Sequence, residues 1–154
     1  MRVFIDTEFT DFAMPELISL GMAGELGEEC YIEVPFAMAR CSDFVRDVVV
    51  PQLGKDPHAF CEAEDLREQI LKWLQIIKRD DPIQICYDSE YDWGLFVQGL
   101  EGRVPDWIEP CWIRSSQINK LMLYSYFKTH PDEHEHHALA DAKANRFSYR
   151  PRRS

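Results

Sequence analysis

The apolar positions in the first part of the chain follow the pattern of β-strands. Residues 2–9 hold a short apolar run near Thr7 and Phe9, two residue types that favour strands. Residues 16–24 and 28–36 are two further apolar segments, and short loops join all three. Because short connections favour hairpins, this part of the chain predicts three strands in an antiparallel meander.

The apolar period then changes to that of helices. The clearest amphipathic helix is predicted at residues 62–79, where acids fill the first turn and Lys78 and Arg79 lie at the end, as the helix dipole prefers. Ser42 has the side chain of an N-cap for an earlier helix, which is predicted to stop near Pro51. The apolar face of the clearest helix consists of Leu66, Ile70, Trp73, Leu74 and Ile77.

Strands and helices alternate in the rest of the chain. The predicted order, β-β-β-α-α-β-α-β-α-α, indicates one domain over residues 1–154 of the α/β class, with a mixed sheet flanked by helices. The later strands are predicted at residues 82–88 and 107–116, and the later helices at residues 89–102, 116–128 and 138–150.

The composition agrees with one folded domain. The chain has 154 residues, of which 45% are hydrophobic, enough for a core. No apolar stretch reaches the roughly 18 residues of a membrane span, and the N-terminus lacks the pattern of a signal peptide, so we expect a cytoplasmic protein without membrane contact. The five cysteines are odd in number and form no C-x-x-C pair, which predicts reduced thiols.

The charge is negative overall and uneven along the chain. A net charge of −10 argues against a protein that coats DNA or RNA electrostatically. Residues 114–154, however, contain 8 basic and 4 acidic residues, and four of the basic ones are Arg146, Arg150, Arg152 and Arg153. This basic tail is either solvated or contacts a phosphate backbone or an acidic partner subunit.

The first candidate site is the pair Asp6 and Glu8, which lies at the end of the first apolar run. Strand side chains alternate, so both carboxylates project from one face. A solvated face would make such a pair unremarkable. On a central strand the two charges repel unless a cation neutralises them, and a hard divalent metal ion is the usual solution.

Two further clusters carry acids and histidines. Asp88, Glu90 and Asp92 follow the strand at residues 82–88; Ser89 with Asp92 matches a capping box, or Asp92 is a third carboxylate aimed at the first strand. His134, His136 and His137 precede a helix that carries Asp141 in its first turns. Their spacing disfavours structural zinc and suggests instead an imidazole base in a mobile loop beside a metal carboxylate.

Taken in order, these clusters resemble the motifs of the DEDDh group of 3′–5′ exonucleases in the ribonuclease H-like superfamily. The matching segments are "FIDTEF", "SEYDWGLF" and "HHALAD". The segments "PELISLG" and "DFVRDVVVPQL" are similar to a narrower branch, the bacterial exoribonucleases of the polyadenylate-specific ribonuclease AS family. The resemblance implies a ribonuclease H-like sheet, and a homodimer that releases nucleoside 5′-monophosphates from single-stranded 3′ ends.

The resemblance also implies a two-metal mechanism with Mg²⁺ or Mn²⁺, the two ions lying about 3.5–4 Å apart. Asp6 would bridge both ions, Glu8 and Asp141 would complete one site, and Asp92 would support the other. His136, by its spacing from Asp141, would take the proton of the attacking water.

The expected substrate contacts are Phe9 and Trp93, as rings that stack on bases, together with Thr7 and Leu17 from the resemblance. The sequence departs from the family at Asp88, where relatives often carry Asn, and at Asp11, where many carry Gly. The motifs do not indicate whether the substrate is RNA or DNA, nor which nucleobase is preferred. A DNA 3′–5′ exonuclease of the proofreading type and a catalytically weak binding module with a nuclease fold therefore remain alternatives.

Overall fold

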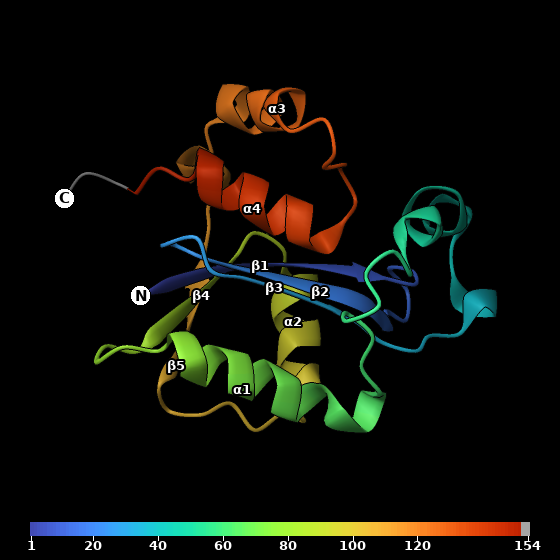
Figure 1. The fold of residues 1–154 in the computed structure, drawn as a ribbon, viewed down its shortest axis with the longest axis horizontal. Coiled ribbons are helices and arrows are strands. Elements are labelled where there is room, and N and C mark those ends of the chain that lie inside the picture. The colour runs from blue at the N-terminus through green and yellow to red at the C-terminus, as the bar shows by residue number, and fades with distance from the viewer. Residues whose placement is uncertain (152–154) are drawn as a thin grey trace.

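The protein folds around one five-stranded sheet with helices on both faces (Figure 1). The computed structural model describes residues 1–151, so Arg152 and Arg153 of the basic tail lie outside the described residues. The predicted α/β class, with a mixed sheet flanked by helices, is confirmed. The strands are β1 (Arg2–Phe9), β2 (Leu17–Gly24), β3 (Glu29–Glu33), β4 (Ile83–Tyr87) and β5 (Ile108–Trp112), and the α-helices are α1 (Leu66–Ile77), α2 (Glu90–Gly99), α3 (Lys120–Thr129) and α4 (Ala138–Ser148).

The strand order is β3-β2-β1-β4-β5, which makes β1 the central strand. β1 pairs antiparallel with β2, and β2 pairs antiparallel with β3, so β1 and β3 run in the same direction on either side of β2. β4 pairs parallel with both β1 and β5. In this register Asp6 lies directly opposite Gly21, and Glu8 lies opposite Ser19.

One face of the sheet forms the main apolar core with α1 and α2. Val3 and Ile5 of β1 point into it and are fully buried, as are Ile70 and Leu74 of α1. Burial of each such side chain stabilises the fold by about 1.5–3 kcal/mol relative to its exposure. Figure 1 shows α1 and α2 together on this face, opposite α4.

The other face lies under α4, with α3 packed beyond it (Figure 1). The helix buries small side chains, among them Ala138 and Ala142, against the sheet. A methyl group built on Gly21 would lie 2.3 Å from backbone atoms of Ala138 and Leu139. The start of α4 therefore rests on the bare backbone of β2, and only glycine allows this approach.

The predicted helix at residues 42–51 takes a different form. Ser42 does accept a hydrogen bond from the Val45 amide at 3.2 Å. The chain then forms the π-turn η2 (Val45–Val49) and the 3₁₀ turn η3 (Val50–Gln52), so Pro51 lies inside the last turn instead of ending the segment. π-Turns of this kind are frequent at functional sites.

One other predicted boundary moves because a cap and a long-range contact decide it. The helix predicted from residue 116 begins at Lys120, where the Asn119 side chain accepts from two backbone amides. Ile118 is drawn instead into a β-bridge with Tyr149. The remaining short 3₁₀ turns are η1 (Met38–Arg40), η4 (Ala63–Asp65) and η5 (Ser115–Gln117).

Two further expectations concern reduced cysteines and the absence of a membrane span. All five cysteines are free thiols, and Cys41, Cys61 and Cys86 are buried. Within residues 1–151, no helix has both the length and the apolar character that crossing a membrane requires.

Candidate metal centre

Acidic side chains from β1, the start of α2 and the start of α4 meet near the end of β1. Asp6, Asp88 and Asp92 form one group, in which one ligand atom from each residue lies within 4.8 Å of the others. Glu8, His136 and Asp141 form a second group by the same measure. The two groups adjoin because Asp6 and Glu8 lie two residues apart on one face of β1.

Asp92 belongs to the first group because β1 holds its carboxylate. Its Oδ1 accepts hydrogen bonds from the Thr7 amide at 3.0 Å and from the Thr7 hydroxyl at 2.6 Å. The side chain of Ser89 does cap α2, through the Tyr91 amide at 3.2 Å. The reciprocal half of the suggested capping box is absent within residues 1–151, because Asp92 bonds to Thr7 instead.

His136 is held in an unusual backbone conformation beside Asp141. Its φ of 61° lies in the left-handed region, which costs a residue other than glycine about 1–3 kcal/mol. Its amide donates to Oδ2 of Asp141 at 2.9 Å, which ties the loop to the start of α4. The ring stands edge-on to Phe44, with centroids 4.9 Å apart.

Gln52 of η3 supports the same loop from the other side. Its side-chain amide lies 3.0 Å from the carbonyl of Glu135 and 3.1 Å from the carbonyl of His136. The segment inserted between β3 and α1 therefore contributes both Phe44 and Gln52 to the position of His136. Both residues lie in the segment "DFVRDVVVPQL", but the sequence alone assigned neither of them a role at the site, because the contacts join positions more than eighty residues apart in the chain.

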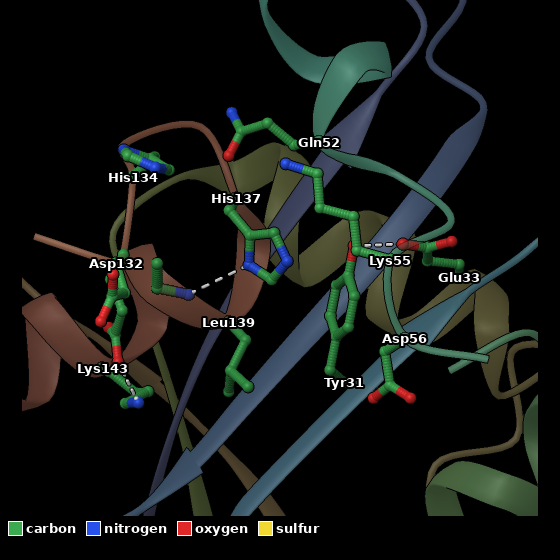
Figure 2. Close-up of a pocket in the computed structure, with 12 residues that line it drawn as sticks. Tyr31, Glu33, Gln52, Lys55, Asp56, Asp132, His134, His137, Leu139 and Lys143 are labelled. Carbon is green, nitrogen blue, oxygen red and sulfur yellow. Dashed lines mark hydrogen bonds and ion pairs between the residues drawn. The ribbon is translucent and has the colours of Figure 1, made fainter. Parts of the chain in front are cut away.

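His137 occupies a separate place. Its ring packs against Tyr31 with centroids 4.3 Å apart, and its Nδ1 accepts from the Ala140 amide at 3.5 Å. Figure 2 shows both rings beside a cavity of about 320 Å³, with Glu33 and Lys143 at its walls. The Tyr31 hydroxyl donates to Glu33 at 2.9 Å. His136 thus belongs to the metal-binding group, whereas His137 caps α4 and lines the neighbouring cavity.

The carboxylates raise one another's pKa. Burial, followed by the charges of Asp141 and Asp92, raises the pKa of Glu8 to about 8. Burial also raises the pKa of Asp92 and of Asp141 to about 7, although hydrogen bonds from Thr7 and from the His136 backbone oppose the rise. Burial and four neighbouring carboxylates hold the pKa of Asp6 well above its ordinary value. At neutral pH this cluster therefore takes up either protons or a cation.

The donor set fits a hard divalent cation. Oxygen ligands predominate, and one imidazole joins them at His136. No lysine or arginine in residues 1–151 forms an ion pair with Asp6, Glu8, Asp88, Asp92 or Asp141. The carboxylate of Asp88, which the sequence placed in the same acidic segment as Asp92, is close enough to share an ion with Asp6.

The residues predicted to contact substrate lie in different surroundings. Phe9 stacks on Tyr91 at 5.2 Å, and Phe12 stands edge-on to both rings. Phe12 is 71% exposed, so it offers more open aromatic surface than the half-buried Phe9. Sequence reasoning did not select Phe12 or Tyr91, although both are aromatic residues within four positions of a motif acid.

The other three predicted contacts do not present an open surface at the carboxylates. Thr7 is buried and is occupied by its bonds to Asp92. Leu17 is buried in the main core. Trp93 packs between Tyr87 and Phe96, with centroids 5.3 and 5.8 Å away, on the apolar side of the sheet.

Comparison with known proteins adds no relative. No family model matches the chain, and no curated protein matches it. Function is therefore inferred from the fold and the cluster of acids.

Proposed function

We propose that this protein is a metal-dependent 3′–5′ exonuclease of the DEDDh type with a ribonuclease H-like fold, acting on single-stranded RNA. The observation that carries the proposal is the convergence of three distant segments. Asp6 and Glu8 from β1, Asp92 from α2, and His136 with Asp141 from the α4 region lie in two adjoining groups near the end of β1. Acids scattered by chance on a surface are not expected to gather so closely that the pKa values of Glu8, Asp92 and Asp141 all rise.

The carboxylates would hold two ions, Mg²⁺ or Mn²⁺. Asp6, Asp88 and Asp92 are spaced to share one ion, and Glu8 and Asp141, which lie beside His136, would share the other. When bound, such ions stabilise negative charge on a scissile phosphate and lower the pKa of a bound water. The hydrogen bonds from Thr7 orient Asp92 toward this task, and the His136 amide orients Asp141.

His136 is the candidate general base. The side chain is exposed, so a water molecule has access to the ring. The Phe44 edge and the clamped backbone limit the ring to few positions, which favours proton transfer from a fixed site. An imidazole suits this role because it titrates near neutrality.

A matched set of nuclease assays tests the proposal. The wild type, given Mg²⁺ or Mn²⁺, is expected to shorten 5′-labelled RNA stepwise and to release nucleoside 5′-monophosphates. Asp6→Asn and His136→Ala should abolish shortening, whereas His134→Ala, an exposed histidine of the same loop, should retain it. Absence of shortening by the wild type, or equal shortening by all variants, would contradict the proposal.

The same assay separates the remaining alternatives. Faster shortening of DNA than of matched RNA would indicate the proofreading type, because only a contact to the 2′-hydroxyl distinguishes the two sugars. Metal binding without hydrolysis would indicate a binding module. A homodimer and a cytoplasmic location stay predictions, and light scattering tests the first of them.

A further inference from the structure

A second cavity opens beside the first group of acids. It has a volume of about 460 Å³ and lies between the end of β5 and the start of α3. Asp88 forms part of its wall, so the cavity and the group of Asp6, Asp88 and Asp92 share one residue. The Asn145 side chain donates to Asp88 at 3.4 Å and also lines the cavity. A ligand that extends from the acids past Asp88 would therefore enter this space.

The far wall of this cavity is basic. Arg114 and Lys120 line it, and both side chains are exposed. Neither forms an ion pair with an acid anywhere in the described range of 1–151, in a chain whose net charge is −10. Two free cations next to a metal-binding cluster suit a ligand with several negative charges along its length.

An aromatic ring completes the cavity. Trp112, at the end of β5, is 47% exposed and stands edge-on to Tyr87 at 5.4 Å. An indole with this exposure offers a surface for a nucleobase, since stacking on aromatic rings is how single-stranded nucleic acids are commonly gripped. An acidic peptide would use Arg114 and Lys120 equally well but would gain nothing from a stacking surface.

We propose that this cavity binds the nucleotides on the 5′ side of the scissile phosphate, with Trp112 stacking on a base and with Arg114 and Lys120 contacting phosphates. The proposal rests on the proposed nuclease function. The direction follows from chemistry: the departing 3′-terminal nucleotide brings only the scissile phosphate, which the ions would hold. Any further phosphate that Arg114 and Lys120 neutralise must therefore belong to nucleotides on the 5′ side.

Two substrates of different length test this assignment. A p-nitrophenyl ester of a nucleoside 5′-monophosphate reaches only the acids, whereas a single-stranded pentanucleotide also reaches the cavity. In the double variant Arg114→Ala/Lys120→Ala, the ratio of kcat/KM for the pentanucleotide to kcat/KM for the ester should fall about tenfold or more, since contacts made only by the longer chain are lost. The matched control is Lys72→Ala/Arg79→Ala, which removes two exposed cations elsewhere and should keep the ratio.

Binding measured without turnover provides the second readout. With Ca²⁺, fluorescence anisotropy of the pentanucleotide should show a weaker salt dependence in Arg114→Ala/Lys120→Ala, its log–log slope reduced by about 1.4, because each phosphate contact contributes roughly 0.7 for single strands. Trp112→Ala should weaken binding, and Trp112→Phe should restore part of it.

The outcomes separate this assignment from the nuclease function. An unchanged ratio and an unchanged salt slope in the Arg114→Ala/Lys120→Ala variant would overturn the assignment, as would equal competition by a poly-glutamate peptide. Failure of the wild type to hydrolyse either substrate would refute the nuclease function instead. The anisotropy data would then decide whether the cavity binds single strands.

Discussion

The central strand β1 presents apolar side chains on one face of the sheet and acidic side chains on the other. On the face toward α1, β1 contributes Val3 and Ile5 to a fully buried apolar core. On the face toward α4, the same strand contributes Asp6 and Glu8 to a cluster of acids whose pKa values rise because their charges are close and poorly hydrated. The apolar face stabilises the fold, whereas the crowded acids lower its stability at neutral pH. Under the proposed metal binding, substitutions on the two faces should therefore affect stability and activity in opposite ways.

The largest effect is expected for Asp6→Asn, on the acidic face. If the proposed ions are bound, loss of the Asp6 carboxylate should lower kcat/KM by about a thousandfold, since metal stabilisation of charge is worth several kcal/mol. The same change removes a buried charge, so Tm of the metal-free protein at pH 8 should rise. Kinetics measures the change in kcat/KM and calorimetry the change in Tm. The control is Asp106→Asn, which changes an exposed acid. A lower Tm for Asp6→Asn would contradict the comparison.

The next effect is expected for Leu74→Ala, on the apolar face. Leu74 is fully buried, so the cavity left behind should lower the free energy of unfolding by about 2–5 kcal/mol. The expected rise in Tm on adding Mn²⁺ should be unchanged, because Leu74 is not among the residues that could hold the ion. Chemical denaturation and thermal melting measure both quantities. Leu121→Ala removes the same atoms from an 81% exposed side chain and should cost little.

The pH dependence of stability gives a smaller effect with a definite sign. Glu8, with a pKa of about 8, and Asp92 and Asp141, with pKa values of about 7, bind protons more tightly when folded than when unfolded. Their contribution to stability is therefore complete below about pH 4 and is lost as pH rises through 7 to 8. In EDTA, Tm should fall between pH 5 and pH 8.5.

Added Mn²⁺ should reverse that fall, with a larger rise in Tm at pH 8 than at pH 5, because the ion competes with protons for the same oxygens. Glu8→Gln should flatten the metal-free profile, whereas Glu109→Gln, an exposed acid on β5, should leave it unchanged. A metal-free Tm that stays constant or rises over this pH range would show that ionisation of the clustered acids does not destabilise the fold.

The smallest effect is expected for Gln52→Ala, which tests how the loop that carries His136 is held beside the acids. Gln52 contacts the loop carbonyls of Glu135 and His136 and is a positioning residue. Its loss should lower kcat about tenfold with little change in KM, because His136 is then held less firmly. The control is Gln75→Ala on the exposed side of α1. A change in KM alone would indicate a substrate contact instead.

The sequence predicted the elements of the apolar face better than the contacts of the acidic face. Strand alternation in β1 and helical spacing in α1 are local patterns, and the structure bears both out. The partner of Asp92 could not be read locally, since Thr7 lies 85 positions away and Ser89 offered a plausible cap nearby. The support from Gln52 has no periodic signal at all, because it depends on a π-turn and a long-range contact.

The bare glycine in β2 has a mechanical consequence. Gly21 lies opposite Asp6 in the sheet and touches the backbone at the start of α4, three residues before Asp141. A contact between two main chains has no rotamers, so thermal motion of side chains cannot loosen it. Direct contact between the two main chains thus fixes the distance between the sheet that carries Asp6 and the helix that carries Asp141.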